Sequence, residues 1–340
     1  MGADLFVNAT GWVFDMEEDL YNPCNVILVD QFSIKTTDGF SISAVAGSDS
    51  EPGYVEGSAD QARFWNIYGI TQWTSSLLVV ADSANHCLRF VDRVSRRTSR
   101  FVGSCGAFGF VDGTGANALF NFPYSLLVLK SSFMLVSDNF NNAIRLVDFD
   151  TSAVSTLVRD ISSPKDMVMA NCGQQFYIST SHSIALDNLR SGTFTIITST
   201  KAGFQDGSLS TAKFLWPAGL GWLDNDTLAV ADVESSKVRL ISLSQSEVTS
   251  ICPTVIERME GSSSSDCPIY YSMSVLRLRD ALYIGGEGSI NFVDLNVGSP
   301  DDSSGSLEGS SGGGDGGEGS GSGGSGSGGS GSGERGRSDG

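Results

Sequence analysis

The segment from Asp112 to Asp148 reads DGTGANALFNFPYSLLVLKSSFMLVSDNFNNAIRLVD and is the clearest copy of a repeat. It combines a turn-forming Asp-Gly pair, a Phe shortly before a proline, and β-rich runs that end in Asp138 and Asp148. An earlier copy ends its corresponding run, LLVVAD, at Asp82, which is 56 residues before Asp138. A period of this length predicts stacked structural units that bury their apolar faces against one another.

Weaker copies extend the pattern in both directions. Phe214, Pro217 and Asp232 mark a fifth copy, and Phe214 lies 94 residues after Phe120, or two periods of 47. A degraded fourth copy therefore lies between them, with Thr180 where the others have Asp. A divergent first copy precedes Asp30, and a sixth begins near residue 272.

Each copy is rich in strand-forming residues. In the copy that begins at Asp112, the runs PYSLLVL, FMLVSD, AIRLVDF and VSTLV predict four strands, and most are continuously apolar, as in sheets covered on both faces. One such unit cannot bury both faces alone, so we expect a closed ring of blades of about fifty residues each. The predicted blades are 1–50, 51–104, 105–159, 160–202, 203–253 and 268–297.

The repeat resembles the NHL-repeat family of β-propellers. The resemblance rests on the DG…A.F..P lead-in and on the V.D..N..IR signature, which is clear from Val80 to Arg89 and from Val136 to Arg145 and weaker from Val230 to Arg239. It implies an all-β, six-bladed propeller over about 290 residues. Only three strands are visible in the sixth unit before Gly298, so we expect a three-stranded closing blade here and a fourth strand from a segment upstream of Met1 in a longer product.

Composition restricts the partners. Residues 298–340 form a Gly/Ser-rich tail that is predicted to be a disordered spacer, and they carry −5 of the net charge of −18. A strongly acidic chain repels phosphate backbones, so the RNA binding known for some NHL proteins is disfavoured. Neither a membrane span nor a signal peptide is visible in this chain.

The charged residues that recur in several copies are predicted to serve the fold. Because the same Asp and Arg return in several blades, we expect each Asp to accept backbone N–H bonds in the turn that follows it, and each Arg to pair with carboxylates or carbonyls. These structural repeat residues are Asp82, Arg89, Asp138, Arg145, Asp232 and Arg239.

Positions at which the copies differ are the better candidates for binding. Aromatic residues follow the lead-in Phe, and polar and aromatic residues fill the turn after the second strand; the family's geometry implies that both groups lie near one end of the ring. Such side chains suit protein or glycan recognition, although the rings could instead wedge between blades. The candidates are Trp65, Phe122, Trp216, Ser83, Asn85, His86, Asn139, Phe140 and Asn141.

Catalytic propellers are the competing class. The amidating lyases of this type need a histidine-rich zinc centre, whereas this chain has only His86 and His182. Lactonase-like propellers need Glu, Asn and Asp around a central calcium, and a sequence cannot show that convergence. We therefore predict a non-enzymatic, monomeric ring that binds a protein partner, with no catalytic residue, no zinc and no other cofactor, and calcium left open.

The cysteines bear on the cellular compartment. Cys87 and Cys105 would face each other across a hairpin, and Cys252 and Cys267 would close a loop between the fifth and sixth blades. Disulfides at these places favour an extracellular or cell-surface protein over a cytoplasmic one. Free, partly buried thiols are the alternative.

Overall fold

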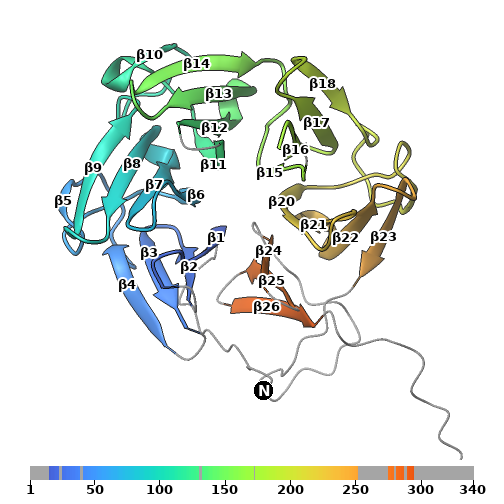
Figure 1. The fold of residues 1–340 in the computed structure, drawn as a ribbon, viewed down its shortest axis with the longest axis horizontal. Helices are drawn as coiled ribbons and strands as arrows, with labels where there is room; N and C mark the ends of the chain where they lie inside the picture. The colour runs from blue at the N-terminus through green and yellow to red at the C-terminus, as the bar shows by residue number, and fades with distance from the viewer. Residues whose placement is uncertain are drawn as a thin grey trace, which may run out of the picture. The chain divides into compact units, whose positions relative to one another are not determined.

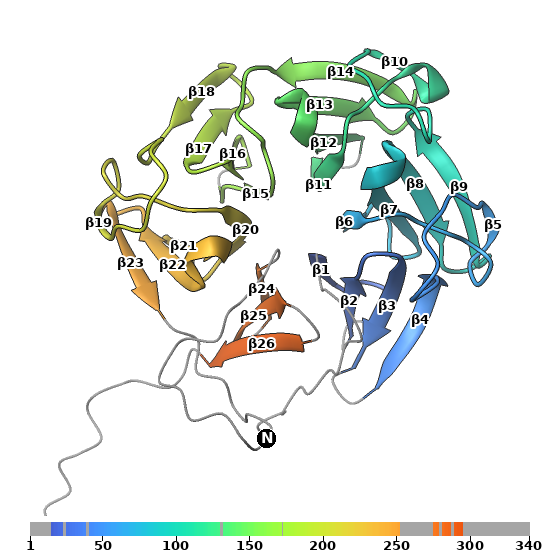
Figure 2. The same ribbon diagram turned by 180° about the vertical axis from the view of Figure 1, so that it is seen from behind.

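Six antiparallel sheets follow one another along the chain and stand around a common centre (Figure 1). The structure is a computed structural model that describes residues 15–22, 25–38, 41–129, 132–171 and 173–251, together with the backbone of 275–278, 281–286 and 289–294. The first strand of each four-strand meander lies nearest the centre in both views (Figure 2). The predicted all-β propeller is confirmed.

The four-strand meanders of the first five blades run from the centre outward, and each strand pairs with the next along the chain. Blade 1 comprises β1 (Asp15–Glu18), β2 (Val26–Val29), β3 (Ser33–Thr37) and β4 (Ile42–Gly47). Blade 2 comprises β6 (Ile67–Gln72), β7 (Leu77–Asp82), β8 (Cys87–Asp92) and β9 (Arg97–Val102), and blade 3 comprises β11 (Pro123–Leu129), β12 (Phe133–Asp138), β13 (Ala143–Asp148) and β14 (Ala153–Val158). Blade 4 comprises β15 (Met167–Met169), β16 (Gln175–Ser179), β17 (Ile184–Asn188) and β18 (Thr193–Ile196), and blade 5 comprises β20 (Pro217–Trp222), β21 (Thr227–Asp232), β22 (Lys237–Ser242) and β23 (Glu247–Ile251).

Three blades have a fifth strand that the sequence did not predict. The segments β5 (Gly57–Ser58), β10 (Gly113–Thr114) and β19 (Gly207–Ser208) pair with the outermost strands of blades 2, 3 and 5. The Asp-Gly and Glu-Gly pairs were expected to form turns only. Gly57 and Gly207 both adopt φ 114°, which lets the chain turn into this short pairing.

The sixth sheet has three described strands, β24 (Val275–Leu278), β25 (Ala281–Gly286) and β26 (Ser289–Asp294), in the order β24-β25-β26. The chain divides after Gly298 into two units, and the second unit, 299–340, lies outside the described residues. The predicted disordered tail, the predicted first lead-in, and Cys252 and Cys267 also fall outside them.

The core lies between the blades. The lead-in phenylalanines Phe64, Phe120 and Phe214 are completely buried. One core position on the third strand is aliphatic in three blades, where Val91, Val147 and Ile241 pair with the second strand at the same register. Blade 4 has Asp187 at this register, and its side chain is also buried.

Candidate functional site

Buried ion pairs hold the turns at one end of blades 2, 3 and 5. Arg89 pairs with Asp82 at 3.0 Å, Arg145 with Asp138 at 2.7 Å and Arg239 with Asp232 at 3.1 Å, and all six side chains are fully buried. Each guanidinium lies between two aromatic rings ten residues apart in the sequence. These ring pairs are Tyr54 and Phe64, Phe110 and Phe120, and Phe204 and Phe214.

Each of these Asp residues also accepts a backbone N–H, but from a different segment than predicted. Asp82 Oδ1 accepts from Trp65 at 2.8 Å, and Asp138 Oδ1 accepts from Asn121 at 2.7 Å. The donors precede the innermost strand instead of following the Asp. The prediction of a following-turn donor was wrong because Asp82 ends β7 opposite Ile67, the first residue of β6, so the lead-in lies beside its carboxylate.

Lead-in segments and turns therefore meet at one end of the ring, which we call the loop face. The first residue of the turn donates its N–H to the lead-in in all three blades: Ser83 to Asn66, Asn139 to Phe122, and Val233 to Trp216. In blades 2, 3 and 5 these turns are the 3₁₀ segments η1 (Ser83–Asn85), η3 (Asn139–Asn141) and η4 (Val233–Ser235).

The polar candidates on this face are used by the fold itself. Asn85 Nδ2 donates to the Gly53 carbonyl at 2.8 Å, and Asn141 Nδ2 donates to that of Gly109 at 2.7 Å. Asn139 Nδ2 donates to the Pro164 carbonyl, and Ser83 Oγ donates to that of Pro123. These side chains join neighbouring segments and are not presented to a ligand.

Four rings lie in two pairs at the boundary of blades 2 and 3. His86 and Phe108 have ring centroids 5.6 Å apart, and Phe122 and Phe140 are stacked at 4.8 Å. The two halves are joined by the backbone N–H of Phe122, which donates to His86 Nδ1 at 3.1 Å. Phe108 is 69% exposed and Phe140 62% exposed. We call His86, Phe108, Phe122 and Phe140 the aromatic surface.

The backbone is unusual at the centre of this surface. Phe122 has φ 61°, a left-handed conformation that is rare for a bulky residue, and Asn66 at the matching position of blade 2 has φ 52°. His86 Nδ1 accepts a hydrogen bond, so the neutral ring carries its proton on Nε2. Burial lowers the pKa of His86, which favours this neutral form.

The other aromatic candidates lie beside or away from this surface. Trp65 is 47% exposed, and its carbonyl accepts the N–H of Ala84 in the turn that precedes His86. Trp216 is 41% exposed on blade 5, with Lys165 Nζ 4.7 Å from its ring centroid. Their exposure rules out a role as buried wedges between blades.

Sequence reasoning missed two members of this region. Phe108 lies in the loop CGAFGF, and the corresponding loop of the preceding copy, DSEPGY, has Pro52 at this place, so the aromatic residue next to Gly109 was the available signal. Tyr68 contacts Phe122 at 5.2 Å and Tyr124 at 4.7 Å between ring centroids, so it continues the rings toward the centre of the propeller. No pattern in the sequence marked Tyr68.

A central pocket of about 300 Å³ is lined by the inner strands of blades 1 to 5. Asp15 Oδ2 accepts the N–H of Ile70 at 2.9 Å, and Asp166 Oδ2 accepts that of Leu220 at 2.7 Å. Asp166 Oδ1 also accepts from Ser125 Oγ at 2.8 Å. These carboxylates therefore connect adjacent blades at the centre.

Burial controls the protonation of these acids. It raises the pKa of Glu17 to about 7 and that of Asp166 to about 6. Burial and the neighbouring Asp166 and Glu17 raise the pKa of Asp15 as well. Within the described ranges, no group of three or more His, Cys, Asp or Glu side chains is arranged to hold a metal ion.

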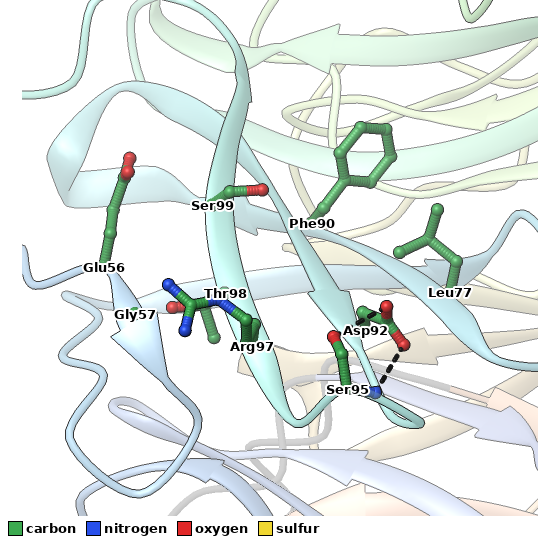
Figure 3. A pocket seen from close by; sticks show the side chains of 9 residues that line it. All are labelled: Glu56, Gly57, Leu77, Phe90, Asp92, Ser95, Arg97, Thr98 and Ser99. Atoms are coloured by element: carbon green, nitrogen blue, oxygen red, sulfur yellow. Dashed lines mark hydrogen bonds between the residues drawn. The ribbon is translucent and has the colours of Figure 1, made fainter.

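A second hollow, of about 560 Å³, lies on the outer part of blade 2 (Figure 3). Its wall includes Phe90, Asp92 and Arg97. Asp92 caps the β8–β9 turn by accepting the N–H groups of Val94 and Ser95, so its carboxylate serves the hairpin. The described segments also contain no helix with the length and hydropathy of a membrane span.

Comparisons with known proteins support the propeller fold. No protein-family model matches the chain. An alignment of length 293 gives 24% identity to Protein SUPPRESSOR OF QUENCHING 1, chloroplastic, of Arabidopsis thaliana, covering 60% of this chain and 28% of that protein. A segment of 132 residues is 28% identical to NHL repeat-containing protein 2 of Bos taurus, covering 36% of this chain and 18% of that protein. The matches thus span less than a third of either relative.

Solved structures show the same fold at low identity. An auxiliary nutrient binding protein from Bacteroides thetaiotaomicron aligns with a TM-score of 0.61 at 12% identity, over 84% of this chain and 70% of that chain. A gluconolactonase from Xanthomonas campestris aligns with a TM-score of 0.59 at 13% identity, over 85% and 88%. A chain of a nidogen/laminin complex aligns with a TM-score of 0.56 at 11% identity, over 80% and 89%. The repeat signature, the NHL-named relatives and this ring of sheets together support an NHL-repeat β-propeller.

Proposed function

We propose that this propeller is a binding module that recognises a protein partner through its aromatic surface. The observation that carries the proposal is that two ring pairs meet at the boundary of blades 2 and 3, where the Phe122 N–H donates to His86, with Phe108 and Phe140 both more than 60% exposed. Clustered aromatic side chains are enriched at protein interfaces and carry much of their binding energy.

The hydrogen bonds of the loop face favour a protein over a glycan. Glycan recognition would use amides beside the rings, but Asn85, Asn139 and Asn141 already donate to backbone carbonyls. The rings are then left to contact apolar side chains. The net charge of −18 further favours a partner with basic residues around such an apolar centre.

Fold neighbours support a binding role by analogy alone, since propellers host many activities. One neighbour is titled an auxiliary nutrient binding protein, and another comes from a nidogen/laminin complex. The proposed ring requires no cofactor for this role.

A photo-cross-linking amino acid at position 140 tests the proposal. A protein captured there should bind the purified chain, and the double substitution Phe108→Ser and Phe140→Ser should weaken its affinity at least about tenfold, as expected for interface hot spots. Phe133→Ser is the matched control, because Phe133 is 40% exposed but lies at the start of β12. Equal loss in both variants, or affinity only for glycans, would contradict a protein site here.

The central carboxylates support a second candidate, a propeller hydrolase or lyase. Acids with raised pKa values are suited to general acid or base catalysis, and Glu17 and Asp166 line the central pocket. Metal analysis of the purified protein and a lactone-hydrolysis assay test this class. Stoichiometric, tightly held calcium or zinc, with turnover lost in Glu17→Gln, would favour the enzyme over the binding module.

We also propose an extracellular or cell-surface location. The supporting observation is the disulfide between Cys87 and Cys105, because such bonds persist in oxidising compartments. Thiol counting on denatured, unreduced protein from its native source tests this. Six free thiols, one for each cysteine of the sequence, would overturn it.

A further inference from the structure

The exposed ring of Phe108 is presented by a loop that links β9 to β10. Gly103 begins this loop with φ 93° and passes so close to Cys87 that a Cβ on Gly103 would lie 3.0 Å from the Cys87 Cα. Backbone bonds on either side of Phe108 tie the loop to its neighbours: Gly106 donates to Asn85 at 2.8 Å, and Gly109 donates to Phe120 at 3.0 Å.

A disulfide between Cys87 and Cys105 adds a covalent tie to the same loop. Cys87 follows His86 directly, and Cys105 stands three residues before Phe108. The bond therefore joins the two segments whose rings meet in half of the aromatic surface. It restricts how far Phe108 can move from His86.

Blade 3 shows that the framework of a blade does not need this bond. Ala143 pairs with Asp138 as Cys87 pairs with Asp82. Val158 and Val102 occupy the same register in the fourth strands of their blades. Ile161 lies three residues after Val158, as Cys105 lies three residues after Val102. Ala143 and Ile161 are both buried, so an apolar pair serves blade 3 at the place where blade 2 has its disulfide.

We propose that the Cys87–Cys105 disulfide is a redox latch for the aromatic surface: while it is intact Phe108 stays against His86, and its reduction by a dithiol releases the Phe108 loop. This inference rests on the proposed function for its biological meaning. The release itself is a property of the loop and can be measured without any partner.

The exchange follows ordinary thiol–disulfide chemistry. A thiolate of the dithiol attacks Sγ of Cys105, which is the less buried cysteine, and Cys87 leaves as a thiolate that takes up a proton. The second thiol of the reagent then attacks the mixed disulfide, and Cys105 leaves in the same way. The protein disulfide gains two electrons and two protons, and the dithiol is oxidised to its own disulfide.

Hydrogen exchange of the whole chain before and after treatment with dithiothreitol tests the latch. We expect the amides of Gly106 and Gly109 to exchange at least about tenfold faster after reduction, as in local opening. The matched segment of blade 3 around Ile161 should not change. The double substitution Cys87→Ala and Cys105→Ile, which copies blade 3, should fold and exchange like the reduced protein under both conditions.

The outcomes are distinct. Unchanged exchange in the loop, faster exchange throughout the ring, or a double variant as protected as the oxidised protein would each overturn the latch. The position-140 cross-link reports separately on the proposed function. A loop that opens in a protein whose rings capture no partner would therefore refute the function and leave the latch intact.

Discussion

The backbone N–H of Phe122 donates to Nδ1 of His86 across the boundary between blades 2 and 3. The bond requires an unprotonated Nδ1, and burial lowers the pKa of His86. His86 thus contributes stability in full above its unfolded pKa of about 6.5, and this contribution is lost as the pH falls through the lower folded value.

We therefore predict that acidification will weaken the hydrogen bond that the Phe122 N–H donates to His86 within the aromatic surface. Hydrogen exchange at Phe122, corrected for its intrinsic pH dependence, should lose protection as His86 protonates in an NMR titration. His182 provides the contrast, because its Nδ1 donates to the Leu215 carbonyl at 2.7 Å, so this bond does not require an Nδ1 that accepts. A Phe122 amide that stays equally protected through the His86 titration would contradict the prediction.

Breaking one buried ion pair should strongly destabilise the ring. Asp138→Ala removes the buried partner of Arg145 at 2.7 Å and the acceptor for the Asn121 N–H, and leaves the guanidinium paired with the partly exposed carboxylate of Asp112. We expect a loss of about 3 to 5 kcal/mol in the free energy of unfolding, measured by chemical denaturation. Asp150→Ala, at an exposed turn, is the control and should cost less than about 1 kcal/mol.

Replacing the buried carboxylate of blade 4 should stabilise the protein. Asp187 is 1% exposed, and its Oδ2 has no hydrogen-bond partner in the part of the chain that the structure describes. Burial raises the pKa of Asp187 to about 6. Because this folded value is raised, the penalty for ionisation is absent below the unfolded pKa and complete above pH about 6.

Asp187→Val, which gives blade 4 an aliphatic residue as in blades 2, 3 and 5, should therefore raise the free energy of unfolding by about 2 kcal/mol at pH 7.5. The gain should shrink at pH 4.5. Val147→Asp is the reciprocal variant in blade 3 and should be destabilised in the same pH-dependent way. A gain from Asp187→Val that does not depend on pH would show that ionisation is not its source.

Close packing of inner strands should make Gly69 intolerant of a side chain. A Cβ at Gly69 would overlap the carbonyl oxygen of Tyr124 on β11, and backbone cannot move aside as a side chain can. We expect Gly69→Ala to cost more than about 2 kcal/mol in denaturation experiments. Gly115→Ala has open space but a φ of 57°, so it should cost only about 1 kcal/mol. Similar costs at both positions would refute steric overlap.

Repetition explains what the sequence could predict. Asp82 and Arg89 return as Asp138 and Arg145, and this recurrence predicted that they serve the fold. It did not predict which backbone N–H donates to each Asp. The short strand β5 (Gly57–Ser58) could not be predicted, because a strand of two residues shows no periodicity in the sequence.

The site was less predictable for physical reasons. An asparagine in a turn looks the same whether it faces solvent or, like Asn85, a carbonyl of the preceding lead-in. Phe108 stands where the preceding copy has Pro52, and nothing in the sequence shows that its ring is exposed beside His86. Asp15 and Asp166 come together only because the ring closes around the central pocket.

The bond from Phe122 to His86 also bears on how such rings can change by duplication. The framework is encoded within one repeat, so a copied blade brings its own Asp, Arg and ring pair. The aromatic surface is encoded by two successive repeats that differ from each other. Inserting a different blade between blades 2 and 3 would therefore keep the framework of each blade and separate the two halves of the surface, whereas duplicating either blade in tandem would keep one copy of the boundary.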